Sequence, residues 1–109
     1  MIKKSNIKIS IIVPTYNCPF IKRSINSVVR QSFKNWELIV TDDCSKNNVE
    51  KIIKKFNDKR IRYFRRNFNK IIGKSRNFGI KKSNFSWIAF LDSDDYWTKN
   101  KLKLVEKNI

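Results

Sequence analysis

The sequence predicts an α/β fold with a mostly parallel, four-stranded sheet that carries helices on both faces. Four short apolar runs alternate along the 109 residues with segments whose apolar residues recur at helical spacing. Strands that alternate with helices pair in parallel, because each helix returns the chain to the same end of the sheet. An apolar share of 40% is typical of a folded protein, so we expect a single domain over residues 1–109.

The first half of the chain supplies two predicted strands and two predicted helices. Residues 7–14 form a nearly continuous β-branched run, typical of a strand buried on both faces, and residues 36–41 give the second strand. Between them, Pro19 suits the first turn of a helix, which carries an apolar face: Phe20, Ile21, Ile25, Val28 and Val29. Ser45 is the predicted N-cap of a second helix, whose apolar positions are Val49, Ile52, Ile53 and Phe56.

The second half repeats this alternation. Residues 61–64 form a short strand inside a basic stretch, which indicates an edge of the sheet. A helix over residues 74–82 is expected to turn Phe78 and Ile80 inward, and residues 87–91 give the fourth strand. Thr98 is the predicted cap of a last helix through Leu102 and Val105.

The charge of the chain is strongly unbalanced, with 25 Lys and Arg against 9 Asp and Glu and a net charge of +16. Such an excess attracts polyanions, although a solvated basic surface is the alternative for most single lysines. The sequence shows neither a long apolar run nor a signal peptide, so we expect a cytoplasmic protein with peripheral contact to anionic lipid at the inner membrane face. In that compartment Cys18 and Cys44 are expected to be free thiols.

The residue types exclude several chemistries. Without histidine and with two cysteines, the chain builds neither the usual zinc sites nor a Ser-His-Asp triad. Its two glycines, Gly73 and Gly79, form neither a GxGxxG turn nor a P-loop. Any phosphate chemistry must therefore use carboxylates with a metal, or cationic side chains.

Polar clusters follow three of the predicted strands at the point where each strand ends. They occupy residues 15–17, 42–43 and 92–95, and they contain five of the nine acidic residues of this basic chain. In open α/β sheets, ligands bind beyond the carboxyl ends of the strands. We therefore expect these clusters to share one rim and to form a binding site.

The last cluster has the form D-x-D, with Asp92 and Asp94 directly after an apolar strand. Two carboxylates at this spacing can face one cleft and supply oxygen ligands to Mg²⁺ or Mn²⁺. Such an ion would neutralise the charge that develops on a leaving diphosphate. The alternative is an acidic turn or a cap that leads into the last helix.

The other clusters suit the remaining parts of a nucleotide. Asp42 and Asp43 could accept hydrogen bonds from a base or ribose, although carboxylates near a helix N-terminus are favourable in any case. Tyr16 offers a ring on which a base can stack, or it is an ordinary loop aromatic. Arg76 could pair with a diphosphate, with solvated surface as its alternative.

Four segments in order resemble the motifs of family 2 glycosyltransferases, and together they span nearly the whole chain: ISIIVPTYN at 9–17, ELIVTDDCS at 37–45, GKSRNFGI at 73–80 and WIAFLDSDDYW at 87–97. The resemblance implies the Rossmann-like N-terminal half of a GT-A fold. It also implies a nucleotide-diphosphosugar donor, with UDP-sugars favoured, a divalent metal, and inverting transfer of the sugar to an acceptor hydroxyl.

Carried over by position, the resemblance implies a donor-binding set formed by Pro14, Thr15, Tyr16, Asp42, Asp43, Arg76, Asp92 and Ser93. Asp43 would recognise the base, with Asp42 beside it. Asp92 would touch the ribose or the metal, and Asp94 would be the principal metal ligand. The role of Asp95, which follows the D-x-D, is left open.

Two departures from the family pattern bear on function. Cys44 stands where the family has glycine, so we expect the backbone there to avoid conformations that only glycine reaches freely. In the family, an acceptor-binding half with the catalytic base follows the D-x-D strand. No residue of this chain is assigned that role, so we expect donor binding without transfer. A truncated gene product, a fragment of a longer protein, and a split enzyme with a separate acceptor-half chain as its partner all fit.

A basic nucleic-acid-binding module without enzymatic activity is the alternative function. A basic and aromatic stretch favours it, formed by Arg60, Arg62, Tyr63, Phe64, Arg65 and Arg66. The sequence shows no known nucleic-acid-binding motif, and an acidic rim would repel phosphates unless a metal were bound. Nucleic acid is therefore the less favoured partner.

Overall fold

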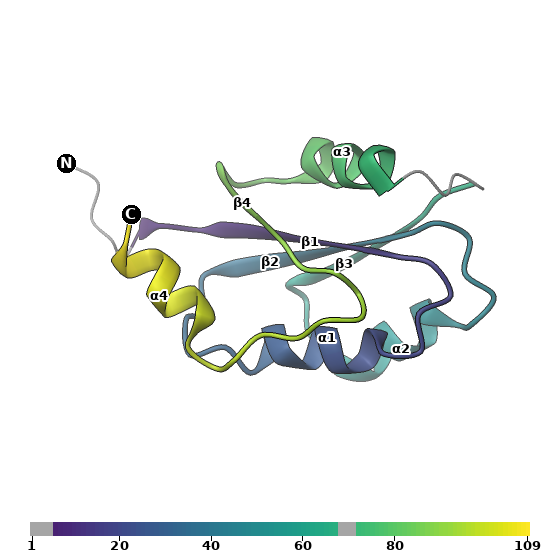
Figure 1. Cartoon of the computed structure of the whole chain (residues 1–109), viewed down its shortest axis with the longest axis horizontal. Coiled ribbons are helices and arrows are strands. Elements are labelled where there is room, and N and C mark those ends of the chain that lie inside the picture. The colour runs from purple at the N-terminus through teal and green to yellow at the C-terminus, as the bar shows by residue number, and fades with distance from the viewer. Residues whose placement is uncertain (1–5, 68–71) are drawn as a thin grey trace.

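The computed structural model describes residues 6–67 and 72–109 and confirms the α/β prediction (Figure 1). Its strands are β1 (Ile9–Thr15), β2 (Trp36–Asp42), β3 (Ile61–Arg65) and β4 (Trp87–Phe90). They form one four-stranded sheet in the order β3-β2-β1-β4, and every neighbouring pair is parallel. The predicted edge position of β3 is confirmed, and β4 forms the other edge.

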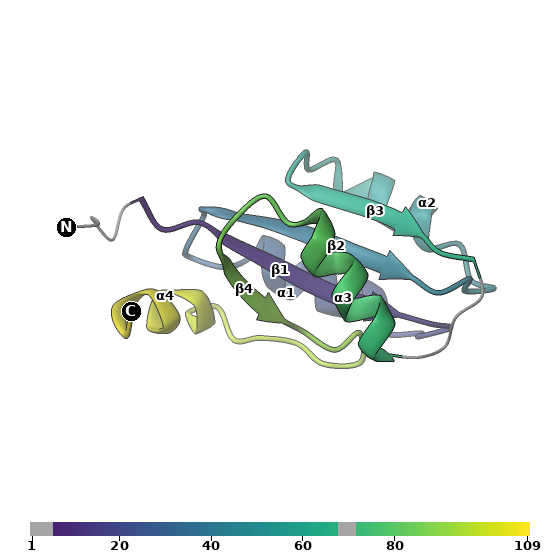
Figure 2. The same ribbon diagram turned by 90° about the horizontal axis from the view of Figure 1, so that it is seen from above.

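Helices cover both faces of the sheet, as predicted. The helix α1 (Ile21–Val29) lies beside α2 (Val49–Phe56) on one face, and α3 (Ile72–Lys82) lies on the other (Figures 1 and 2). The last helix, α4 (Lys101–Lys107), lies beside the start of β4. None of the helices in the described segments is long and apolar enough to cross a bilayer.

The direction of the strands positions the site. Because all four strands are parallel, their carboxyl ends meet at one edge of the sheet. The chain moves outward from β1 through β2 to β3, and it then crosses over to place β4 on the other side of β1. The strand order therefore reverses between β1 and β4, which is where open α/β sheets bind ligands.

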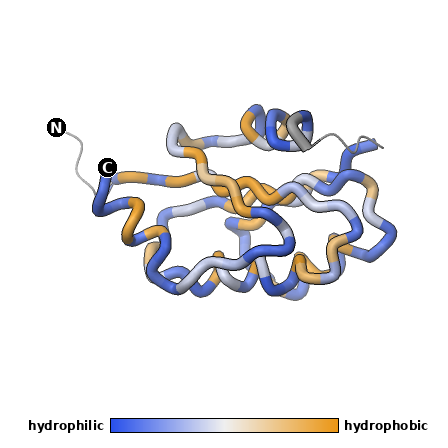
Figure 3. Tube along the Cα trace, viewed as in Figure 1, coloured by the Kyte–Doolittle hydropathy of each residue, from blue (hydrophilic) through white to orange (hydrophobic). Residues whose placement is uncertain are grey.

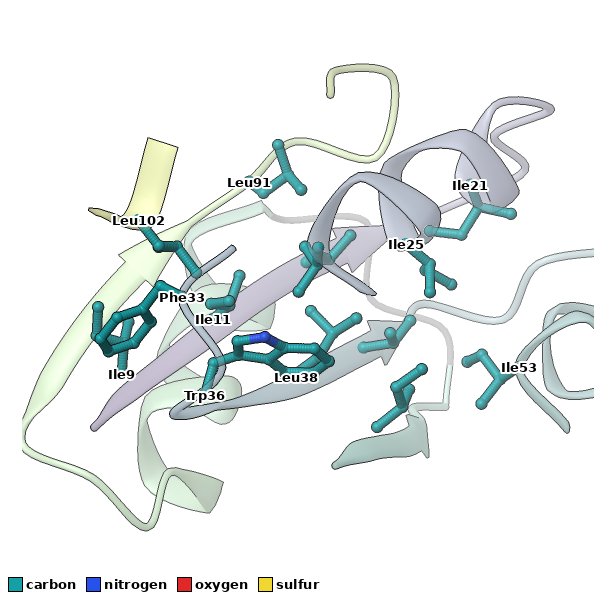
Figure 4. Close-up of a cluster of buried hydrophobic side chains, with 14 of the residues drawn as sticks. Ile9, Ile11, Ile21, Ile25, Phe33, Trp36, Leu38, Ile53, Leu91 and Leu102 are labelled. Carbon is teal, nitrogen blue, oxygen red and sulfur yellow. The ribbon is translucent and has the colours of Figure 1, made fainter. Parts of the chain in front are cut away.

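The core lies between the sheet and the α1–α2 layer. Every residue of β2 is buried, and β1 is buried except for Pro14, which is partly exposed. Apolar residues gather along the strands at the centre of the molecule, whereas the outer helical faces are hydrophilic (Figure 3). The contributions of the helices to this core include Ile21, Ile25, Ile53 and Leu102 (Figure 4).

Two predicted core positions are wrong. Phe20 is 49% exposed, because it occupies the N-cap of α1 and lies outside the helical face that packs on the sheet. Ile80 is 42% exposed, because α3 approaches the sheet through Gly79, and the next residue points away from this contact.

The predicted helix starts also need correction. Asn48, not Ser45, caps α2 by accepting a hydrogen bond from the amide of Lys51 at 3.0 Å. The hydroxyl of Ser45 instead accepts the amide of Asn17 from the neighbouring loop at 2.9 Å. Helix α1 begins at Ile21, so Pro19 precedes its first turn. Asn100, not Thr98, is the N-cap of α4, and Thr98 contributes its carbonyl to the turn before it.

Close packing of α3 on the sheet depends on Gly79. A Cβ atom at this position would lie 2.6 Å from Cγ2 of Ile12, which is fully buried in β1. One turn earlier, the hydroxyl of Ser75 lies 2.7 Å from that of Thr41 in β2. These two contacts hold α3 against β1 and β2, and they place the adjacent residue Arg76 near the carboxyl ends of the strands.

A buried carboxylate ties the strands together at the opposite end of the sheet. The side chain of Glu37 accepts hydrogen bonds from the hydroxyl of Ser10 at 2.6 Å, the amide of Asn84 at 2.6 Å and the guanidinium of Arg62 at 3.1 Å. Burial raises the pKa of Glu37, but these hydrogen bonds outweigh burial and bring its pKa below the ordinary value.

We expect Gly79→Ala to lower the free energy of unfolding by about 1–3 kcal/mol, because the added methyl group overpacks the contact with Ile12. The intrinsic helix propensity of alanine acts in the opposite direction and is smaller. Denaturant unfolding measures the change. Asn77→Ala, at an exposed position of the same helix, is the control and should be neutral or slightly stabilising.

We expect Glu37→Gln to destabilise the protein by about 1–3 kcal/mol near neutral pH, because an amide cannot accept all of these hydrogen bonds. The folded-state pKa is lowered, so the carboxylate stabilises the fold above its ordinary value of 4.5, and this contribution is lost as pH falls through the folded-state value. The difference between wild type and variant, measured by denaturant unfolding, should therefore shrink in acid. A difference that is constant from pH 7 to pH 3 contradicts this account.

Candidate functional site

A cavity of about 580 Å³ opens at the carboxyl edge of the sheet, where the strand order reverses. Its volume lies in the range of about 300–1,000 Å³ that is typical of small-molecule sites. All of the predicted site residues except Asp42 line it: Pro14, Thr15, Tyr16, Asp43, Arg76, Asp92, Ser93 and Asp94. Three separate strand ends and one helix thus contribute to a single space, as the positions of the polar clusters predict.

Asp42 lies behind the cavity wall with its side chain fully buried. Its carboxylate accepts hydrogen bonds from the amide of Ser45 at 2.9 Å and the hydroxyl of Tyr63 at 2.5 Å, and Arg65 lies 3.7 Å away. Burial and the bond to Asp42 raise the pKa of Tyr63 to about 12, so the phenol remains a donor at neutral pH. Asp42 is therefore buried away from the cavity and shapes the loop after β2.

Asp43 lines the cavity directly. Its amide donates to the carbonyl of Thr15 at 3.0 Å, and its carboxylate accepts from Arg66 at 2.9 Å. Burial raises the pKa of Asp43 above its ordinary value, and the positive charge of Arg66 limits the rise. The paired carboxylate can still accept further hydrogen bonds, because each carboxylate oxygen has two lone pairs.

The loops after β1 and β2 are tied to each other below the cavity. The side-chain oxygen of Asn17 accepts the amide of Lys46 at 2.7 Å, and Asn17 returns its own amide to Ser45. Cys44, which directly precedes Ser45 in the loop after β2, has a φ of 67°. The expectation that its backbone avoids glycine-like conformations is therefore wrong. A left-handed residue other than glycine costs about 1–3 kcal/mol. The bond from Ser45 to Asp42 and a contact from Arg65 to the Cys44 sulfur at 3.3 Å hold this turn in place.

Both cysteines are free thiols, as predicted. Cys18 is buried and lines the cavity with Pro19 and Phe20, which the sequence analysis did not assign to the site. The sequence groups Phe20 with the apolar face of the first helix, because it precedes Val28 by eight residues, a helical spacing. Its place three residues after the first polar cluster is a sequence signal that could have assigned it to the rim.

Arg76 crosses the cavity from α3 to the D-x-D turn. Its guanidinium donates to Oδ1 of Asp92 at 3.1 Å and lies over the ring of Phe90, 5.4 Å from its centroid. Both side chains of this ion pair are partly exposed. A ligand with a stronger negative charge can therefore displace Asp92 from the guanidinium of Arg76. The guanidinium of Arg76, which the sequence predicts near a diphosphate, thus contacts the acidic turn in this structure.

Two polar atoms in the cavity wall are buried and have no hydrogen-bond partner within residues 6–67 and 72–109: the hydroxyl of Thr15 and Nε of Arg76. Unpaired buried polar atoms are costly, and in native proteins each calls for an explanation such as a bound ligand or water. Both atoms border the same cavity. This arrangement is what a site that accepts a polar ligand requires.

Asp92 and Asp94 are exposed carboxylates that face the cavity from one turn, which is closed by a bond from the amide of Asp95 to the carbonyl of Asp92 at 3.0 Å. Across residues 6–67 and 72–109, no group of three or more His, Cys, Asp and Glu side chains could hold a metal. Two carboxylates suit a hard divalent ion that draws its remaining ligands from water and phosphate oxygens, as Mg²⁺ does. The donor set therefore fits an ion that binds together with a diphosphate.

The basic stretch around β3 is committed to contacts within the fold. Its four arginines pair with carboxylates in turn, as Arg60–Asp58, Arg62–Glu37, Arg65–Asp42 and Arg66–Asp43. Arg62 also lies over the ring of Phe64, 5.2 Å from its centroid. Cations that neutralise internal carboxylates have less charge to offer phosphates, so this stretch gives little support to the nucleic-acid alternative.

Comparison with known proteins relates this geometry to a family. The family model described as "Glycosyl transferase family 2" matches residues 10–109. A relative from Escherichia coli, UDP-Glc:alpha-D-GlcNAc-diphosphoundecaprenol beta-1,3-glucosyltransferase WfgD, is 42% identical over 97 residues, which cover 88% of this chain and 38% of the relative. The chain thus spans less than half the length of this curated relative.

Solved structures agree with the sequence comparison. The crystal structure of S. aureus TarS 1-349 in complex with UDP-GlcNAc has a TM-score of 0.86 and 35% identity, over 93% of this chain and 30% of that one. The mannosyltransferase PcManGT from Pyrobaculum calidifontis, in complex with GDP-Man and Mn²⁺, shares the fold at a TM-score of 0.75 and 17% identity, over 85% of this chain and 30% of that one. Since the family match covers nearly the whole chain and the fold is the one these enzymes share, the chain belongs to glycosyl transferase family 2.

Proposed function

We propose that this chain binds a nucleotide-diphosphosugar together with a divalent metal and forms the donor site of an inverting glycosyltransferase. The observation that carries the proposal is the cavity at the strand reversal, whose lining includes the D-x-D carboxylates and two buried polar atoms without a hydrogen-bond partner among the described residues. A UDP-sugar is the favoured donor. The similar TarS structure contains UDP-GlcNAc, and WfgD is named for UDP-Glc.

The nucleotide occupies the part of the cavity formed by the loops after β1 and β2. Tyr16, which is 38% exposed at the rim, offers its ring to the base. Asp43 accepts hydrogen bonds from the base, and the hydroxyl of Thr15 gains the partner that it lacks in this structure. Asp42 keeps the loop in shape from behind and acts as a positioning residue.

The diphosphate lies toward the D-x-D turn. Asp92 and Asp94 would hold Mg²⁺ or Mn²⁺, which supplies positive charge to the departing diphosphate. Arg76 pairs with Asp92 in this structure and contributes its charge to the same phosphates when the donor binds. These residues bind and orient the donor, and they favour the separation of sugar and nucleotide.

Deprotonation of the acceptor hydroxyl is not assigned to any side chain in the described segments. The carboxylates of the cavity are each engaged by an arginine or belong to the D-x-D turn. The relatives are longer than this chain, so we propose that acceptor binding and the catalytic base lie in a further part of the domain, on the same chain or a partner chain.

Titration of the chain with UDP-glucose and UDP-GlcNAc, with Mn²⁺ and with EDTA, tests donor binding. We expect metal-dependent binding that Asp94→Ala weakens by about tenfold or more, because a charged ligand to the ion is lost. Glu50→Gln, on the exposed surface of α2, is the control and should leave the affinity unchanged. Tight, salt-sensitive binding of a duplex oligonucleotide without any response to nucleotide sugars would instead favour the nucleic-acid alternative.

We also propose that the protein is cytoplasmic and docks on anionic lipid through the α1–α2 face. This face carries the exposed cations Lys22, Lys51 and Lys55, and Lys22 and Lys55 border a groove of about 230 Å³ with the apolar side chains of Ile52 and Phe56. Lysines beside apolar surface suit a layer of anionic headgroups above acyl chains. The WfgD relative is named for a lipid-linked substrate, a diphosphoundecaprenol.

Vesicle co-sedimentation tests this face. We expect salt-sensitive binding to phosphatidylglycerol vesicles and none to phosphatidylcholine, since each cation contributes about fivefold to partitioning. The double variant Lys22→Glu/Lys55→Glu should lose about 25-fold or more. The matched variant Lys74→Glu/Lys81→Glu, on the exposed side of α3 across the sheet, should bind nearly as well as wild type. If the two double variants lose vesicle binding equally, the α1–α2 face is not a dedicated lipid-binding face.

A further inference from the structure

Helix α1 carries a buried polar residue that neither the core nor the donor cavity accounts for. Ser24 has no exposed surface, although its neighbours on the inner side of the helix, Ile21, Ile25 and Val28, are apolar core residues. A buried hydroxyl is costly unless it is hydrogen-bonded, so its partners indicate what it does.

The acceptors near the hydroxyl of Ser24 all belong to the D-x-D turn. Its hydroxyl lies 2.7 Å from the carbonyl oxygen of Ser93 and 3.3 Å from that of Asp92, and it also contacts the carbonyl oxygen of Asp95. The single hydroxyl hydrogen of Ser24 thus has three carbonyl oxygens of the same turn within reach. The hydroxyl fixes the backbone from which the two metal-binding carboxylates project.

The adjacent residue holds the remaining carbonyl. Arg23 donates from Nη2 to the carbonyl oxygen of Asp94 at 3.0 Å. Its guanidinium lies over two aromatic rings, 4.9 Å from the centroid of Phe20 and 4.8 Å from that of Tyr96. These two cation–π contacts favour the position from which the guanidinium reaches the turn.

A second anchor holds the segment that follows the turn. Gln31, fully buried directly after the C-cap of α1, donates to the carbonyl of Thr98 at 2.7 Å and accepts the amide of Leu102 at 3.0 Å. The chain from Asp92 to Leu102 therefore runs along α1, and it is bound at one end to Ser24 in the helix and at the other to Gln31 just after it (Figure 1).

The sheet gives the turn less support than α1 does. Strand β4 is an edge strand that ends at Phe90, and the last ladder bond runs from the amide of Leu91 to the carbonyl of Ile12 at 3.0 Å. Beyond that bond, the turn has its internal hydrogen bond, the exposed pair of Asp92 with Arg76, and the contacts from α1.

We propose that Arg23 and Ser24 are positioning residues for the D-x-D turn, and that α1 thereby sets the geometry with which Asp92 and Asp94 hold the metal. The proposal rests on the donor site inferred above. It adds that the affinity for the metal-bound donor depends on a helix whose serine does not itself line the cavity but contacts residues that do.

The test compares Ser24→Ala with Ser27→Ala. Ser27 is the matched control, because its hydroxyl donates within α1 to the carbonyl of Ser24 and does not reach the turn. Hydrogen exchange should become about fivefold to tenfold faster in the amides of residues 93–97 in Ser24→Ala, the factor expected for one lost hydrogen bond, and should not change there in Ser27→Ala.

A second measurement separates positioning from general destabilisation. In wild type, the affinity for a UDP-sugar should be higher with Mn²⁺ than with EDTA. In Ser24→Ala this gain should be about fivefold to tenfold smaller, while the affinity without metal stays at the wild-type level. Arg23→Gln, at an exposed position, should show the same pattern, and it decides the matter if Ser24→Ala unfolds.

Unchanged exchange in residues 93–97 in both Ser24→Ala and Arg23→Gln would overturn the proposal, and so would an equal loss of affinity with and without metal. The exchange measurement does not depend on the donor. If wild type fails to bind any nucleotide sugar, the proposed function fails, and the exchange of the turn still shows whether α1 holds it.

Discussion

The pairing of β1 with both of its neighbours is the constraint on which the remaining structure depends. Seven residues of β1 pair with seven of β2, and its first four also pair with β4, all in parallel. This strand is buried on both faces, so its β-branched side chains contact α3 on one side and the α1–α2 layer on the other. Because the strand order reverses at β1, the loops after β1, β2 and β4 meet over a single opening, and residues far apart in the chain share one cavity.

The carboxylates near the site of this basic protein have different environments and different roles. Asp42 and Asp43 are adjacent in the chain, yet the first is closed off by Ser45 and Tyr63 and the second faces the cavity with Arg66 beside it. The arginines around β3 neutralise carboxylates that are buried or half-buried, which would otherwise be costly to desolvate. Much of the charge that suggests a polyanion partner thus stabilises the fold. The exposed lysines Lys22, Lys51 and Lys55 on the outer face of α1 and α2 remain available for a partner.

Tertiary contacts replaced several local preferences. Ser45 has the residue type and position of a helix cap, but its hydroxyl accepts a hydrogen bond that joins two loops. Asn48 caps the helix three residues later. Cys44 adopts a backbone conformation that its side chain disfavours, because the contacts of Asp42 and Arg65 fix the turn on both sides. Phe20 fits a helical repeat by spacing, but it lies at the cavity rim because the helix begins one residue later. A sequence pattern compares each residue with its neighbours in the chain. The positions of Ser45, Cys44 and Phe20 depend instead on residues about 20 or more positions away or on the exact start of an element.

The sequence by itself determined the α/β class, the four strands, the strand-end clusters and the family, because hydrophobic periodicity and polar residues at strand ends are local patterns. It also placed in one site most of the residues that line the cavity, but not Cys18, Pro19 and Phe20. Only the tertiary structure decided that Asp42 lies behind the wall, that Arg76 already pairs with Asp92, and that α1 holds the D-x-D turn through Arg23 and Ser24. Those facts depend on which side chains meet across elements about 15 to 70 residues apart in the chain, and no local pattern specifies such distances.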